Sequence, residues 1–97
     1  MTYSLHPGAE RDVADALDFY GRHAGLVVAK RFLDEFERVV TLLVERPGLG
    51  VPTKSGRRVF PLKVFPYSVV YREIQSGIRI VIVRHQHRKP GYAEGRR

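Results

Sequence analysis

The chain has 97 residues, 43% of them hydrophobic, a formal net charge of +7 and no cysteine. A chain of this length forms one domain with a modest core, and the lack of cysteine excludes disulfides and thiolate metal sites. The sequence contains no run of about 18 apolar residues and no apolar signal-peptide core, so we expect a cytoplasmic protein without a membrane span.

The charge is divided unevenly between the two halves of the chain. Residues 1–50 carry six Lys and Arg against eight Asp and Glu, a net charge of −2, whereas residues 51–97 carry eleven against two, a net charge of +9. Eight of those eleven cations are arginine, whose planar guanidinium suits forked contacts to phosphate. The second half therefore favours an anionic partner.

The first half predicts a short strand followed by a helical hairpin. Residues 1–6 read as the strand, and Pro7 stands where helices commonly begin, with Glu10 and Asp12 in the first turn, where the helix dipole favours acids. A short turn at Gly25 leads into a second helix, which ends at Pro47-Gly48. This second helix is the clearest element, because apolar residues recur at three- and four-residue steps: Ala29, Phe32, Leu33, Phe36, Val39, Val40 and Leu43.

The second half predicts a loop and then three strands. Residues 48–56 are rich in Gly, Pro and Ser and carry Lys54. The runs RRVFPL, PYSVVYREI and GIRIVIVRH are rich in strand-forming residues, and Gln75-Ser76-Gly77 makes a hairpin turn between the last two. The order β-α-α-β-β-β predicts a single α+β domain over residues 1–97, a mostly antiparallel sheet with the helical hairpin packed on one face. The other face is then free to carry the basic side chains.

The stretch RHQHRKPGY gathers titratable and cationic side chains directly after the last predicted strand. His85 and His87 are two positions apart, so on a strand they would project to the same side and could bind a metal or transfer protons near neutral pH. A histidine that caps a main-chain group explains the pattern equally well. Glu73 and Glu94 are the only carboxylates of this half and lack metal-ligand spacing, so we expect no metal and no cofactor.

Several catalytic classes find no support in the sequence. It has no Gly-rich phosphate loop ending in Lys-Ser/Thr, no nucleophile motif around its serines and no paired carboxylates in its basic half. Chemistry in this half would depend on Arg, Lys, His and Tyr, which suit metal-independent RNA cleavage by attack of the 2′-OH, because that reaction needs proton transfer and cations at the phosphate. The same side chains also suit holding a phosphate backbone without cutting it.

Four stretches of the chain, taken in order, resemble a known family. HPGAERDVADALDFY, AKRFLDEFERVVTLLVERPGLG, RRVFPLKVFPYSVVYRE and IVIVRHQHRKPGY are similar to the RelE/ParE superfamily of toxins from bacterial type II toxin–antitoxin systems, and closest to its ParE-like branch of plasmid stabilisation proteins. The most specific parts are FPYSVVYR and an ending made of His85, Gln86, Arg88, Pro90, Gly91 and Tyr92.

This resemblance implies the same fold, a cognate acidic antitoxin and a toxin–antitoxin hetero-oligomer. It leaves two kinds of target open. ParE-like toxins bind DNA gyrase, whereas RelE-like toxins enter the ribosome and cleave messenger RNA without a metal. The first kind makes this protein a growth-arresting binding toxin, and the second makes it an endoribonuclease.

The resemblance also suggests roles for individual residues. In the nuclease branch, side chains at or near the positions of His85, His87 and Tyr92 are catalytic. Cations that would bind a phosphate or the target correspond to Lys54, Arg58, Arg72, Arg84 and Arg88. The chain departs from the nuclease pattern in having Lys54 as the sole remnant of a lysine-rich stretch, and from close relatives in having Ala93 where a Trp often follows the PGY tyrosine.

Overall fold

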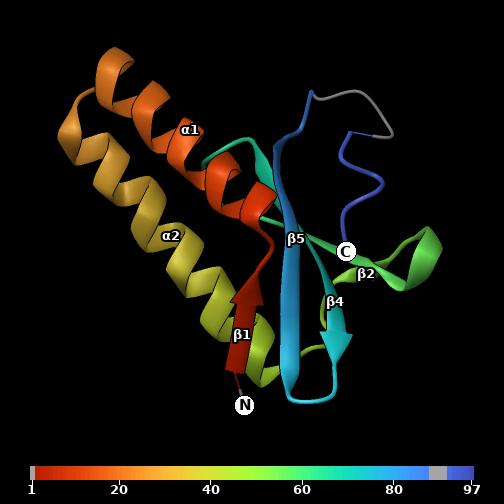
Figure 1. Ribbon diagram of the computed structural model, residues 1–97. Helices are drawn as coiled ribbons and strands as arrows, with labels where there is room; N and C mark the ends of the chain where they lie inside the picture. The colour runs from red at the N-terminus through yellow and green to blue at the C-terminus, as the bar shows by residue number, and fades with distance from the viewer. Residues whose placement is uncertain (1, 88–91) are drawn as a thin grey trace.

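A computed structural model describes residues 2–87 and 92–97. Figure 1 shows two long helices packed side by side on one face of a sheet, with the C-terminal segment (residues 92–97) on the opposite face. The elements are β1 (Thr2–Leu5), α1 (Pro7–His23), α2 (Leu26–Glu45), β2 (Val51–Pro52), a short 3₁₀ turn (Lys54–Gly56), β3 (Arg58–Pro61), β4 (Tyr67–Ile74) and β5 (Gly77–His85). The predicted α+β order is confirmed, with the two-residue strand β2 added from within the predicted loop. No helix of the described residues is long and apolar enough to cross a membrane.

The sheet has five strands in the order β1-β5-β4-β3-β2. β1 lies parallel to β5, and the other neighbours are antiparallel. Ile74 pairs with Gly77, so the predicted hairpin turn between β4 and β5 is confirmed. The last strand is therefore inserted between the first strand and the rest of the sheet, which places the end of β5 beside α1.

The main core lies between the sheet and the helical hairpin. The apolar stripe of α2 is buried as its spacing predicts, and it meets side chains from the middle of β4 and β5. The fully buried members include Phe32, Val39, Leu43, Val69, Tyr71, Ile78 and Ile80. Edge-to-face contacts join Tyr67 to Phe32 and Phe65 to Tyr20, with ring centroids 5.1 Å and 5.2 Å apart. These aromatic residues stabilise the fold by packing.

A β-bulge in β5 reverses the alternation of its side chains. Val70 pairs with Ile82 whereas Tyr71 pairs with Ile80, so Val81 is the extra residue. Val81 and Ile82 therefore both belong to a second apolar cluster with Val70, on the face away from the helices. The expected free face is thus partly apolar, and the C-terminal segment covers this part with Tyr92 and Ala93.

Tyr71 fastens the loop after α2 to the sheet. Its side chain is fully buried, and its hydroxyl donates to the Pro47 carbonyl at 2.7 Å and accepts from the Gly50 N–H at 2.8 Å. A Cβ atom on Gly50 would lie 2.6 Å from that hydroxyl, so the loop can approach this closely only with glycine. Burial raises the pKa of Tyr71, so the hydroxyl stays protonated and keeps both bonds.

His6 begins helix α1. The Nδ1 atom of its side chain accepts from the Gly8 N–H at 2.9 Å, and its main-chain N–H donates to the Ile80 carbonyl at 2.8 Å. Burial lowers the pKa of His6 below 6.5, and the nearby arginines, Arg79 foremost, lower it further. The neutral imidazole is the form that can accept at Nδ1, so the electrostatic surroundings and the helix cap favour the same state.

We predict that Tyr71→Phe lowers the free energy of unfolding by about 1–3 kcal/mol, because it leaves a buried N–H and a carbonyl without their partner. Urea unfolding followed by circular dichroism measures this difference. The control is Tyr3→Phe, whose side chain is half exposed. Equal stabilities of the two variants would contradict the role given to the Tyr71 hydroxyl.

We also predict a pH dependence that His6 contributes. Because its folded pKa is lowered, the unfolded chain takes up the proton first as the pH falls. The stabilisation is therefore complete above about pH 6.5 and is lost as the pH falls through the folded pKa. His6→Asn keeps a side-chain acceptor for Gly8 and cannot titrate. Its unfolding free energy should fall less than that of the wild type between pH 7 and pH 5, and parallel curves would contradict the prediction.

Candidate functional site

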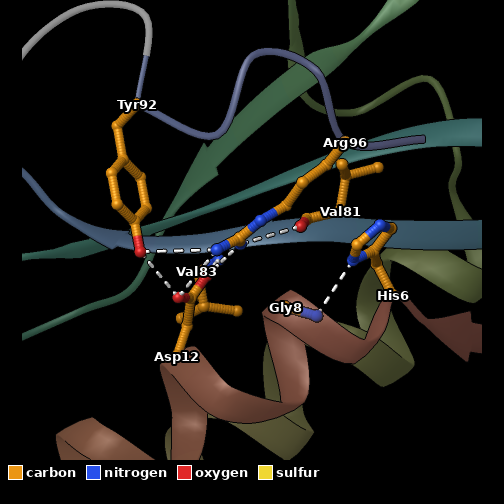
Figure 2. A network of polar contacts seen from close by, with 7 residues as sticks. All are labelled: His6, Gly8, Asp12, Val81, Val83, Tyr92 and Arg96. Carbon is orange, nitrogen blue, oxygen red and sulfur yellow. Dashed lines mark hydrogen bonds and ion pairs between the residues drawn. The ribbon is translucent and has the colours of Figure 1, made fainter.

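A buried carboxylate lies where α1 meets the end of β5. Asp12 is only 8% exposed, and its Oδ2 accepts from the Val83 N–H at 3.0 Å (Figure 2). β1 pairs with β5 only along residues 77–80, so beyond Ile80 this edge of β5 has no strand beside it in the described part of the chain. The Asp12 carboxylate there accepts the hydrogen bond of a main-chain N–H that would otherwise bind a neighbouring strand. The expectation that Asp12 lies in the first turn of the helix is wrong, because α1 begins at Pro7 and only Glu10 is acidic in that turn. Asp12 lies one turn later, where it reaches the edge of β5.

Two side chains from the C-terminal segment complete the site. Arg96 Nη1 lies 2.7 Å from Asp12 Oδ2, and the Tyr92 hydroxyl lies 3.0 Å from Asp12 Oδ1 (Figure 2). Arg96 Nη1 also donates to the Val81 carbonyl at 3.3 Å, and its guanidinium lies over the Tyr92 ring, 5.3 Å from the centroid. Burial by itself lowers the pKa of Arg96, but the hydrogen bonds and charges of Asp12 and Tyr92 together raise it. The guanidinium therefore stays charged beside Asp12.

The position of the Arg96 side chain explains why a glycine, Gly8, stands near the start of α1. A Cβ atom at Gly8 would lie 2.4 Å from Arg96 Nε, so the guanidinium can lie across the helix only because Gly8 has no side chain. Residues 92–96 are thereby tied to the start of α1 and the edge of β5 together. We call this set, Asp12, Tyr92 and Arg96, the tail anchor.

Two of the three predicted acid–base residues, His85 and Tyr92, line one cavity, and His87 lies beside His85. His85 lies on the helix side of the sheet, with its ring 5.2 Å from Tyr67 and 5.1 Å from His87. Its Nδ1 accepts from the His87 N–H at 3.2 Å, which is the capping contact that the sequence left open. A cavity of about 210 Å³ joins His85 to the tail anchor and is lined by Asp12, Asp15, Phe19, Tyr67, His85 and Tyr92. Within residues 2–87 and 92–97, no three His, Asp or Glu side chains gather in a way that would hold a metal ion.

The predicted cations divide between the two faces of the sheet. Arg84 and Lys54 line a second cavity, of about 220 Å³, on the face away from the helices, together with Arg57, Tyr92 and Glu94. Arg72 lies on this same face farther along the sheet, opposite Arg79 in the strand register. Tyr92 lines both cavities, so it marks the boundary between them.

Arg58 lies elsewhere and has another role. It pairs in register with Tyr71, which places it on the helix side. Its Nη1 donates to the carbonyls of Gly48 and Gly50 at 3.2 Å and 2.9 Å, and its Nε lies 3.9 Å from Glu73. Arg58 therefore stabilises the loop after α2. The expectation that the basic side chains share one face is wrong for Arg58, because its register places it on the helix side. Arg88 lies outside the described residues.

The sequence analysis did not predict the ion pair between Asp12 and Arg96. For Asp12 a signal existed, since it stands between Ala9 and Ala16 at helical spacing, on the stripe that becomes buried. A carboxylate on a buried stripe requires a partner. Nothing in the sequence identifies that partner as Arg96.

We predict that Asp12→Ala lowers the free energy of unfolding by about 3–5 kcal/mol, because it leaves a largely buried guanidinium without its counter-charge and the Val83 N–H without its acceptor. The matched control is Asp18→Ala on the same helix, whose ion pair with Arg22 is exposed and worth no more than about 0.5 kcal/mol. Urea unfolding of both variants measures the difference. A loss at Asp12 no larger than that at Asp18 would refute the tail anchor as a source of stability.

Comparison with known proteins identifies the family. The family described as "ParE toxin of type II toxin-antitoxin system, parDE" matches residues 3–90. Among solved structures, the chain is similar to one described as "Chromosomal ParDE TA system from P. aeruginosa", with a TM-score of 0.77 and 24% identity over 88% of this chain and 95% of that chain. A search of curated proteins finds no match. Because the family match spans nearly the whole chain, the protein belongs to the ParE toxin family of type II toxin–antitoxin systems.

Proposed function

We propose that this protein arrests growth by binding a protein target, DNA gyrase, and that it does so without catalysis. The observation that carries the proposal is that His85 is separated from the candidate cations while the Tyr92 hydroxyl is bonded to Asp12. The Tyr92 hydroxyl lies within hydrogen-bonding distance of the buried Asp12 carboxylate, and His85 lies on the opposite face of the sheet from Arg72 and Arg84. Phosphodiester cleavage needs proton donors, acceptors and cations around one phosphate.

The charge distribution supports a macromolecular target. Residues 51–97 carry a net charge of +9, and Arg72, Arg79 and Arg84 lie on the face away from the helices, where they attract an acidic or DNA-bearing partner and speed its approach. Arg84 and Lys54 line the same open cavity on that side. We therefore assign target binding to this face, with Arg84 as a contact residue.

A cognate antitoxin is the second partner that we propose. Toxins of type II systems are held inactive by antitoxins, and an acidic antitoxin segment would match the basic half of this chain in charge. The complex would be a toxin–antitoxin hetero-oligomer. Its affinity should fall as the salt concentration rises, because screening weakens the attraction between opposite charges.

The alternative is a metal-independent, ribosome-dependent endoribonuclease. The arrangement of Lys54, Arg84 and Tyr92 around one cavity is the feature that favours it. In that case Tyr92 would have to leave Asp12 before it could act on a substrate, and His85 or His87 would supply the acid or base from across the edge of the sheet.

We predict that the purified toxin inhibits supercoiling by DNA gyrase and leaves ribosome-bound messenger RNA intact. Arg84→Gln should raise the toxin concentration needed for half inhibition about tenfold, the effect of losing about 1.4 kcal/mol of binding free energy. Arg31→Gln on α2 removes the same charge from the helix layer and should change little. A supercoiling assay run beside primer extension on translated message measures both activities.

New 5′ ends at ribosome-occupied codons, with supercoiling unaffected, would overturn the gyrase proposal in favour of the nuclease. His85→Ala and Tyr92→Phe would then identify the catalytic groups by their loss of cleavage. Inhibition of supercoiling that is equal for wild type and Arg84→Gln would keep the target and remove Arg84 from the contact surface.

A further inference from the structure

The loop between β3 and β4 holds a valine in a conformation that valine rarely adopts. Val64 has a φ of 72°, in the left-handed region, and its side chain is 96% exposed. The loop is held in place, because the Lys63 N–H donates to Glu35 Oε2 on α2 at 2.7 Å and the Leu62 N–H donates to the Tyr67 carbonyl at 2.9 Å. Glycine or asparagine would fit this backbone with less strain. A strained and exposed apolar side chain in such a loop is best explained as a contact residue.

Val64 stands beside an open groove between this loop and α2. The groove has a volume of about 680 Å³, and its apolar lining comes from Val28, Val64 and Phe65. Val27 is 68% exposed and lies one helical turn before Arg31, which also lines the groove, so Val27 extends the apolar surface along α2. We call Val27, Val28, Val64 and Phe65 the valine patch.

The shape of the valine patch suits a second copy of the same chain. A projecting apolar side chain and an apolar hollow lie next to each other on one surface. In a two-fold contact the same surface faces itself, so the projection of each copy meets the hollow of the other. The contact would remove the exposed valine of both copies from water, and the burial of apolar surface drives most protein association.

The charges around the valine patch also suit a second copy. Two molecules that each carry a net charge of +7 repel one another, so they associate most readily where the local charge is nearly balanced. The groove has such a balance, with Arg31, Arg38 and Lys63 against Asp34 and Glu35. In the described part of the chain Arg31 and Lys63 form no ion pair, and the side chain of Asp34 is 58% exposed. Basic side chains of one copy can therefore face acidic side chains of the other.

Two other hollows of the described surface lack this balance. The groove beside β1 is lined by Glu10 and Glu37 without a cation, and the cavity at Arg84 has three cations against Glu94 alone. Like charges would face one another if two copies met at either place. The comparison favours the valine patch as the surface for self-association.

We propose that two copies of the free toxin associate through the valine patch about a two-fold axis, with Val64 of each copy in the groove of the other. The contact uses α2 and the loop between β3 and β4, so it leaves the face of the sheet away from the helices open. The proposal does not depend on the identity of the toxin's target.

The test is sedimentation equilibrium of the purified toxin, without antitoxin, over a range of protein concentrations. The wild type should show a reversible equilibrium between monomer and dimer. Val64→Asn should raise the dissociation constant of the dimer about tenfold or more, because it removes the apolar projection. Asparagine is well tolerated in the left-handed region, so this variant should unfold at a urea concentration no lower than the wild-type monomer does. The loss of the dimer then cannot come from a loss of folding.

The matched control is Val51→Asn, which makes the same substitution at a 68% exposed position on β2, outside the valine patch. It should dimerise as the wild type does. A wild type that stays monomeric at millimolar concentration, or a dimer that Val64→Asn weakens no more than Val51→Asn does, would overturn the proposal. A monomeric wild type in which the cognate antitoxin shifts the amide signals of residues 63–65 would overturn it in favour of the antitoxin as the occupant of the groove.

Discussion

The contact on which most of this structure depends is the one between the Asp12 carboxylate and the Val83 N–H. A carboxylate that is 8% exposed must find donors for both of its oxygens, and here they come from the edge of β5 and from the C-terminal segment. One side chain thus joins the first helix, the last strand and the end of the chain. The position of the C-terminal segment, and with it the shape of the face away from the helices, follows from this contact.

The β-bulge at Val81 makes the arrangement possible. By placing Val81 and Ile82 on the same face, it creates an apolar patch that Tyr92 and Ala93 cover. After the bulge Val83 points back toward the helices, and its N–H lies within reach of Asp12. Bulges are common where a strand must redirect its side chains near a functional surface. This one lets the C-terminal segment pack against the sheet while its arginine reaches the helix.

The basic half of the chain is divided by the sheet into parts with different roles. Arg58 supports a loop from the helix side, Arg96 completes a buried ion pair, and Arg84 faces an open cavity. Net charge alone therefore overstates the surface that is available to a partner. The separation of His85 from the cations of the other face, together with the bond between the Tyr92 hydroxyl and Asp12, is what favours binding over catalysis in the function we propose.

The amino-acid sequence alone predicted the element order, the hairpin turn before Gly77, the buried stripe of α2 and the family, because each depends on local periodicity, turn chemistry or an ordered set of motifs. It did not determine that Arg58 would face away from Arg72 and Arg84, or that Asp12 would meet Arg96. Those facts depend on strand register, on one inserted residue in β5 and on a contact between residues 84 positions apart. Such features are decided by packing across the whole domain, so only the tertiary structure reveals them.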